Sequence, residues 1–159
     1  MSLLELKSYG SKITFTSTTN KDWESYAISE QFIPSGENGK FEFYPPNNNK
    51  SFIIGFTSRK TYTEWPGREY TIAKYPGNAV TGDPIRLKKN RSSDITPSGA
   101  VKSFPRLSDK LTVEKSDGEV RFYLNGFWIH TLTLTQEEDL RIIFKFGFGG
   151  SSFSIPEVK

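Results

Sequence analysis

The residues best suited to recognise a ligand stand on either side of one predicted turn. Arg121 and Tyr123 precede an Asn-Gly pair, and Trp128 and His130 follow it. A two-residue turn pairs the two aromatic residues with each other and Arg121 with His130, so all four side chains share one face. Aromatic rings stack on sugars or peptides, and Arg and His donate hydrogen bonds. This face is therefore a candidate binding surface.

The opposite face of the same predicted hairpin is wholly apolar. It carries Val120, Phe122, Leu124, Phe127 and Ile129. The turn sets Leu124 opposite Phe127, and it sets Phe122 opposite Ile129. We expect this apolar face to lie in the core.

Two interpretations of the polar face stay open. Leu132 and Leu134 continue that face along the second strand, which favours a face packed beneath another strand or sheet. Without such a cover, the face is an exposed aromatic and polar platform that suits a sugar ring or a peptide.

A second candidate site lies in a loop that contains Tyr62, Trp65 and Arg68. Because a Pro-Gly pair follows Trp65, the indole has no evident core to enter, and an exposed loop Trp is typical of a binding hot spot. The alternative is that Trp65 folds back over the end of a sheet. Trp23 stands in a similar polar context, and there core packing is the favoured interpretation.

The composition removes several kinds of catalytic site. The chain has no Cys and one His, which excludes disulfides, thiolate catalysis, Cys-based zinc sites and His-rich metal sites. No Gly-x-Ser-x-Gly elbow or phosphate-binding Walker loop is present. We therefore expect neither an enzyme nor a cofactor. A structural calcium ion at residues 47–49 or at Asp83 stays open as an alternative.

Carboxylates in the sequence do not form an evident catalytic pair of the kind that glycoside hydrolysis needs. Glu42 and Glu69 are candidates for outward positions on strands, but nothing marks them as partners. Acids at 137–139 are interpreted as the solvated start of a helical turn over residues 135–139, because acids favour a helix N-terminus.

Alternating apolar and polar residues along the chain predict β-strands throughout. Strands are predicted at residues 12–16, 26–29, 40–44, 52–56, 70–73, 85–87, 100–104, 111–114, 119–124, 127–132 and 140–148. The strongest turn signals are Asp117-Gly118 and Asn125-Gly126, because both central residues of a type I′ turn need positive φ. About ten to twelve short strands with even turn spacing predict one antiparallel β-sandwich of jelly-roll type over residues 1–159, with a closed barrel as the alternative.

Charge and hydropathy exclude some partners. Lys plus Arg total 21 and Asp plus Glu total 18, so the net charge is only +3. The densest basic run, residues 86–91, is interpreted as an edge strand or solvated loop, and no nucleic acid is expected. No apolar stretch approaches the roughly 18 residues of a membrane span, and the N-terminus lacks a signal-peptide pattern.

Several stretches of the sequence resemble a known superfamily. Residues 23–29, 33–34, 39–43 and 54–57 resemble the opening of concanavalin A-like lectin/glucanase domains, and residues 108–113 and 120–126 resemble later paired strands of the same superfamily. Laminin-G-like and SPRY-like domains have a similar Tyr-x-Asn-Gly hairpin. The resemblance covers nearly the whole chain in order.

This resemblance implies a jelly-roll sandwich of two curved sheets, with carbohydrate binding on or beside the concave sheet. It also implies a module of a larger surface or secreted protein, with a role in adhesion. The Glu-x-Asp-x-Glu pattern of the glucanase branch is absent, and the legume-lectin metal ligands are not recognisable. We therefore expect a non-catalytic module whose partner is a glycan. The alternatives are a protein-binding module of SPRY or laminin-G type and, third, a glycoside hydrolase or lyase.

Overall fold

The computed structural model describes residues 3–6, 11–17, 26–43, 52–60, 68–74, 83–90, 94–99, 103–104 and 110–146. These residues form twelve strands, all paired antiparallel, and no helix. The strands are β1 (Leu3–Leu6), β2 (Ser11–Ser17), β3 (Tyr26–Ser29), β4 (Gly39–Phe43), β5 (Phe52–Thr57), β6 (Glu69–Lys74), β7 (Asp83–Lys89), β8 (Ser103–Phe104), β9 (Leu111–Ser116), β10 (Glu119–Leu124), β11 (Phe127–Thr133) and β12 (Arg141–Phe146). Every strand predicted from the sequence has a counterpart here, whereas β1 was not predicted.

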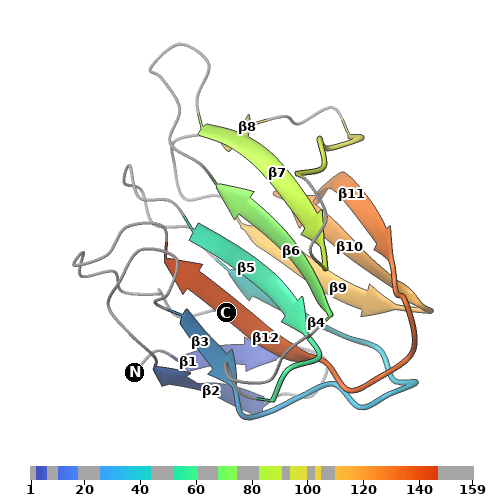
Figure 1. Cartoon of the computed structure of the whole chain (residues 1–159). Helices are drawn as coiled ribbons and strands as arrows, with labels where there is room; N and C mark the ends of the chain where they lie inside the picture. Colours follow the sequence, from blue (N-terminus) through green and yellow to red (C-terminus); the bar gives the residue numbers. More distant parts are fainter. Residues whose placement is uncertain are drawn as a thin grey trace.

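The strands form two stacked layers (Figure 1). The back sheet has the order β11-β10-β9-β4-β1-β2, and the front sheet has the order β3-β12-β5-β6-β7-β8. Strand β2 joins the two layers, because its first half pairs with β1 and its second half pairs with β3. The predicted antiparallel jelly-roll sandwich is therefore confirmed.

Phenylalanine rings from both sheets fill the space between the layers. Phe41 and Phe43 of β4 alternate with partly exposed residues and are fully buried, as their spacing predicts. The Phe41 ring meets Phe56 of the front sheet edge-on, with centroids 5.4 Å apart. Phe43 likewise contacts Phe52 at 5.5 Å and Phe144 at 5.3 Å. Edge-to-face contacts of this kind stabilise the stacking of the sheets beyond the burial of apolar area.

The two hairpin turns of the last third adopt the predicted backbone. Asp117 and Gly118 have φ values of 50° and 79°, and Asn125 and Gly126 have values of 53° and 83°. Both central residues of each turn are therefore left-handed, which matches the twist of the flanking strands. These turns connect β9, β10 and β11 into one meander.

The predicted register of the second hairpin is only half right. Tyr123 pairs with Trp128 as expected, but Phe122 pairs with His130 instead of Ile129. The register shifts here because Ile129 is the extra residue of a β-bulge. The sequence could not indicate it, since the turn fixes only the pairs next to it.

The bulge changes which residues share a face. Arg121 pairs with Thr131, and the prediction that it pairs with His130 is wrong. Phe127 was predicted to lie in the core. It pairs with Leu124 as expected, on the turn side of the bulge, but 68% of its surface is exposed because it lies at the hairpin tip. Leu132 and Leu134 were predicted to continue the polar face, yet both are buried in the core, because the extra residue turns the strand over.

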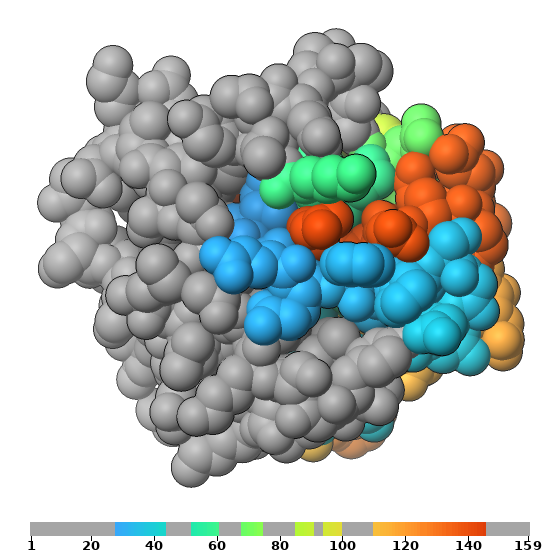
Figure 2. Space-filling view, turned by 90° about the horizontal axis from the view of Figure 1, so that it is seen from below, coloured from blue at the N-terminus to red at the C-terminus, as the bar shows by residue number. Residues whose placement is uncertain are grey.

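The predicted helical turn over residues 135–139 is also wrong, since this segment contains no helix. The acidic side chains of this segment bind other parts of the chain. Glu137 accepts a hydrogen bond from Lys115 at 3.0 Å, and Asp139 accepts one from the Ser35 N–H at 2.8 Å. The Lys115 side chain is fully buried, and its hydrogen bond lowers the pKa of Glu137. In Figure 2 the blue-to-cyan residues 28–43 lie against the orange-red end of 110–146, the two segments that the Ser35–Asp139 hydrogen bond joins.

A short segment, residues 94–99, links the open edges of the two sheets. Ile95 exchanges two backbone hydrogen bonds with Leu87 of β7, at 2.7 and 2.9 Å. The Gly99 N–H donates to the Ile129 carbonyl of β11 at 2.7 Å. A Cβ on Gly99 would lie 2.3 Å from the Trp128 carbonyl, so only glycine permits this approach.

Candidate functional site

The outer face of β4, β9, β10 and β11 is open to solvent and carries polar and aromatic residues. We term it the meander face. Its residues form two cross-strand rows: Trp128, Tyr123, Thr112 and Glu42 in the first, and Thr131, Arg121, Glu114 and Lys40 in the second. None of the eight is buried, whereas the residues that alternate with them point into the core. One wet face and one packed face are typical of antiparallel sheets.

Trp128 is the most accessible aromatic residue of this face, with 44% of its surface exposed. Its indole N–H donates to the Thr131 hydroxyl at 2.8 Å. The bulge makes this contact possible, because it places Thr131 on the same face as Trp128. To reach Thr131, the indole must lie along the strand, so its polar atom is satisfied while almost half of its surface stays exposed.

Arg121 lies in the second row between two acids. Its guanidinium contacts Glu119 at 2.8 Å and Glu114 at 3.7 Å. The hydrogen bond that Arg121 donates to the Glu119 carboxylate raises the pKa of Arg121. Arg121 is thus held in position, and its charge is balanced by carboxylates of the same face.

His130 lies beside this face but faces the edge of the sandwich. Its Nδ1 accepts a hydrogen bond from the Ser98 N–H at 3.2 Å, which ties β11 to the 94–99 segment. An accepting Nδ1 carries no proton, so the ring in this geometry is the neutral tautomer protonated on the other nitrogen. The structure therefore brings together Arg121, Tyr123 and Trp128, and it places His130 at their margin.

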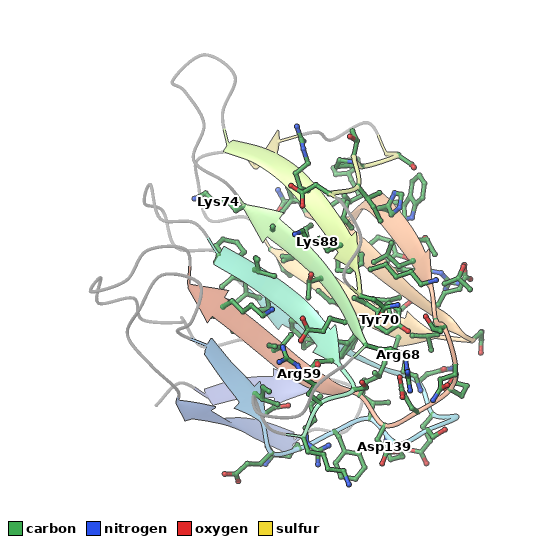
Figure 3. All side chains as sticks on the ribbon, viewed as in Figure 1. Arg59, Arg68, Tyr70, Lys74, Lys88 and Asp139 are labelled. Atoms are coloured by element: carbon green, nitrogen blue, oxygen red, sulfur yellow. The ribbon has the colours of Figure 1, made fainter. Side chains whose placement is uncertain are left out.

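Residues of the second predicted site are only partly described. Tyr62 and Trp65 lie outside the described residues, as does Trp23. Arg68 precedes β6 and binds Glu138 with two bonds, of 2.6 and 3.0 Å. This bidentate pair raises the pKa of Arg68. Arg68 therefore belongs to the end of the front sheet, not to the meander face (Figure 3).

A third polar group was not predicted as a site. On the outer face of the front sheet, the Glu69 carboxylate accepts bonds from Arg59, Lys145 and Thr57. The Arg59 Nε lies 2.9 Å and the Lys145 Nζ 3.0 Å from Glu69 oxygens. We term these four residues the Glu69 cluster. Figure 3 labels Arg59 at the lower end of this sheet.

Three residues of the Glu69 cluster are buried, and Lys145 is partly buried. Glu69 is 8% exposed, Arg59 5% and Thr57 0%. Burial by itself raises the pKa of Glu69, but the charges of Lys145 and Arg59 outweigh it and hold that pKa below its ordinary value. Lys145 in the apolar run of β12 is the one signal in the sequence that could have indicated a paired buried charge.

Two further observations concern the described residues alone. They hold no group of three or more His, Asp or Glu side chains arranged to bind a metal ion. They form no helix of the length and hydropathy needed to cross a membrane. Residues 47–49, one of the calcium alternatives, lie outside them, and Asp83 begins β7, where it pairs with Phe104.

No protein-family model matches this sequence, and no curated protein matches it. Several solved structures, in contrast, are similar to this chain. The chain is similar to the carbohydrate recognition domain of Emp47p, with a TM-score of 0.51 and 8% identity over 88% of this chain and 75% of that one. It is also similar to a β-glucanase from Bacillus licheniformis, with a TM-score of 0.50 and 16% identity over 93% of this chain and 70% of that one.

The domain has the concanavalin A-like fold. Identities this low establish the fold and leave the function to be argued from the site. Within the concanavalin A-like sandwich, the two outer faces differ: the meander face is accessible, and the Glu69 cluster on the opposite face is buried.

Proposed function

We propose that this domain is a non-catalytic, lectin-like module that binds carbohydrate on the meander face. The observation that carries the proposal is the half-exposed indole of Trp128, which lies along β11 with its N–H satisfied by Thr131 and with Tyr123 beside it. A flat apolar ring beside hydroxyl groups suits a sugar, which has an apolar ring face and polar edges.

Two contacts support the choice of a sugar as ligand. The Thr131 hydroxyl, which holds Trp128, is also able to donate to a ligand oxygen. Arg121 is fixed by Glu114 and Glu119, so its remaining N–H groups are positioned without further loss of side-chain entropy. Aromatic stacking beside fixed donors is the usual composition of a small-molecule site.

The non-catalytic part of the proposal is supported by the state of Glu69. Glycoside hydrolysis needs one carboxylic acid with a raised pKa as proton donor. The pKa of Glu69 is lowered, and its oxygens bind Arg59 and Lys145. Glu42, the other outward glutamate predicted from the sequence, lies on the opposite sheet.

The names of the two similar structures agree with a carbohydrate ligand, since one is a carbohydrate recognition domain and the other a β-glucanase.

We further propose that the domain works as part of a larger surface or secreted protein, in adhesion. Because a single module binds sugars weakly, neighbouring modules would supply avidity. Tyr62, Trp65 and Arg68 remain proposed contacts of a second subsite.

A glycan array tests the proposal. Wild-type protein is expected to bind at least one glycan, and Trp128→Ala is expected to lose that binding, because the stacking surface is removed. Trp65→Ala on the same array tests the second subsite. The thermal unfolding midpoint of each variant shows whether it is folded. Binding that survives Trp128→Ala would contradict the assignment of the site.

A protein ligand is the second candidate, and Phe127 favours it. This ring is 68% exposed at the hairpin tip, next to Trp128. Adjacent exposed aromatic residues are typical of protein-binding hot spots. If no glycan binds the folded wild-type protein, a protein-interaction module of SPRY or laminin-G type becomes the better proposal, and Phe127→Ser is the variant that tests it.

A further inference from the structure

We infer that the 94–99 segment positions Trp128 for its ligand, and that protonation of His130 releases this segment from β11. The segment, which we term the strap, lies near β11 as a short yellow trace in Figure 1. This inference rests on the proposed carbohydrate-binding function and adds a dependence on pH to it.

The two ends of the strap are held in different ways. At the β7 end, Ile95 exchanges two backbone hydrogen bonds with Leu87 and packs against the core. At the β11 end, the Ser98 N–H donates to Nδ1 of His130 at 3.2 Å. Backbone groups do not titrate near neutral pH, whereas Nδ1 accepts a hydrogen bond only while it carries no proton. The bond to His130 is therefore the one that depends on pH.

The strap also stabilises the bulge of β11. A bulge leaves its extra residue without regular pairing to the neighbouring strand. Here the Ile129 carbonyl accepts a hydrogen bond at 2.7 Å from the Gly99 N–H of the strap. The approach is close, since a Cβ on Gly99 would lie 2.3 Å from the Trp128 carbonyl. Gly99 thus fixes the backbone of Trp128 and Ile129 from the open edge of the sheet.

The bulge in turn determines where the indole lies. Because Ile129 is an extra residue, Thr131 lies on the same face as Trp128, and its hydroxyl accepts the indole N–H at 2.8 Å. A strap that leaves β11 removes a hydrogen-bond partner from the bulge and loosens this arrangement. Gly99 and His130 are therefore positioning residues, which act on a ligand through Trp128 without touching it.

Protonation of His130 places a second donor opposite the Ser98 N–H. The proton that Nδ1 gains lies where that nitrogen now accepts, so repulsion between two N–H groups replaces the hydrogen bond. Histidine side chains ordinarily gain this proton at about pH 6.5. The chain contains one His, so a side-chain transition near that pH belongs to His130. The strap should be held at about pH 7.5 and released at about pH 5.5.

The charges on the elements around His130 are already paired. Two described elements pack against β11 at this residue, namely β10 and the strap. Their ionisable side chains are Glu119, Arg121, Tyr123 and Asp94. Arg121 contacts Glu119 at 2.8 Å. Asp94 lies 3.5 Å from Lys88 of β7. Carboxylates, guanidinium groups and phenols ordinarily keep their charge state between about pH 7.5 and about pH 5.5, so His130 is the group that switches.

Nuclear magnetic resonance of the ligand-free wild-type protein tests the inference without a glycan. A titration from about pH 7.5 to about pH 5.5 follows the imidazole C–H of His130, the amide of Ser98 and the indole N–H of Trp128. We expect these signals to shift with one common midpoint, because ring, strap and indole respond to the same proton. Protection of the Gly99 amide from hydrogen exchange, corrected for the intrinsic effect of pH, should fall about fivefold in acid, the usual effect of one hydrogen bond.

His130→Asn separates the proton from the contact. The Asn side-chain oxygen replaces Nδ1 as acceptor and does not titrate, so the Ser98 and Trp128 signals should keep their neutral-pH positions in acid. Gly99→Ala is the converse variant, because its Cβ meets the Trp128 carbonyl and keeps the strap away at every pH. Its Trp128 signal at neutral pH should match the one that wild type reaches in acid. Thermal unfolding midpoints show that both variants are folded, and the wild-type titration needs neither.

The glycan array, run at both pH values, extends the test to binding. Wild-type protein should bind its best glycan about fivefold more weakly in acid, and His130→Asn should bind it equally at both values. A His130 ring that titrates while the Ser98 and Trp128 signals stay constant would overturn the inference and leave carbohydrate binding intact. A ring that stays neutral down to about pH 5, or an equal pH effect in His130→Asn, would do the same. Absence of any bound glycan would overturn the proposed function, whereas the resonances of the ligand-free protein decide separately whether the strap positions Trp128.

Discussion

The polar side chains of the two outer faces of the sandwich differ in their burial and in their contacts. In the Glu69 cluster, the carboxylate is buried and binds Arg59, Lys145 and Thr57. On the meander face, Glu42 has no such contacts among the described residues and reaches solvent. Groups that bind one another stabilise the fold, whereas groups left without intramolecular partners are available to a ligand. A polar cluster by itself is therefore a poor marker of a binding site.

The largest expected effect is on the buried side of this comparison. Glu69→Gln removes the carboxylate charge that pairs with Arg59 and Lys145, and breaking a buried pair costs about 3 kcal/mol of unfolding free energy. Urea titration monitored by tryptophan fluorescence measures it. Glu42→Gln on the meander face is the control, with an expected change of less than about 0.5 kcal/mol. Equal effects of the two variants would contradict the distinction between the faces.

A smaller effect is expected with pH. Because the pKa of Glu69 is lower in the folded protein than in the unfolded chain, its ionisation stabilises the fold above the ordinary glutamate value of about 4.3. That contribution is lost as the pH falls through the folded pKa. The stability difference between wild type and Glu69→Gln should therefore shrink in acid. A difference that stays constant down to about pH 3 would mean that Glu69 is not the titrating group.

The smallest effect is expected on the exposed side. Arg121→Ala removes ion pairs with Glu114 and Glu119 that are open to solvent, so the unfolding free energy should not change measurably. Calorimetry with the bound glycan should nevertheless show weaker binding, because a positioned donor is lost. A clear loss of stability without any loss of affinity would place Arg121 among the structural residues.

The features that the sequence predicted well are set by residues close together in the chain. The Asp117-Gly118 and Asn125-Gly126 turns have the backbone that their residues favour, and alternation placed Phe41 and Phe43 in the core. Such signals lie within a few residues of the feature that they specify. They were enough for the jelly-roll fold and for the pairing of Tyr123 with Trp128.

What the sequence did not predict depends on distant contacts. The extra residue at Ile129 brings Thr131 beside Trp128, yet no turn signal marks a bulge. Members of the Glu69 cluster come from three separate parts of the chain, and Lys145 lies 76 residues from Glu69. Charges so far apart become partners only once the strands are paired.

Strand β2 has a consequence for how the protein unfolds. Its first residues pair with β1 in the back sheet, and its last residues pair with β3 in the front sheet. Neither layer can separate from the other without breaking hydrogen bonds within this one strand. Loss of one layer should therefore carry the other with it, so that denaturation follows a single cooperative transition instead of two successive ones.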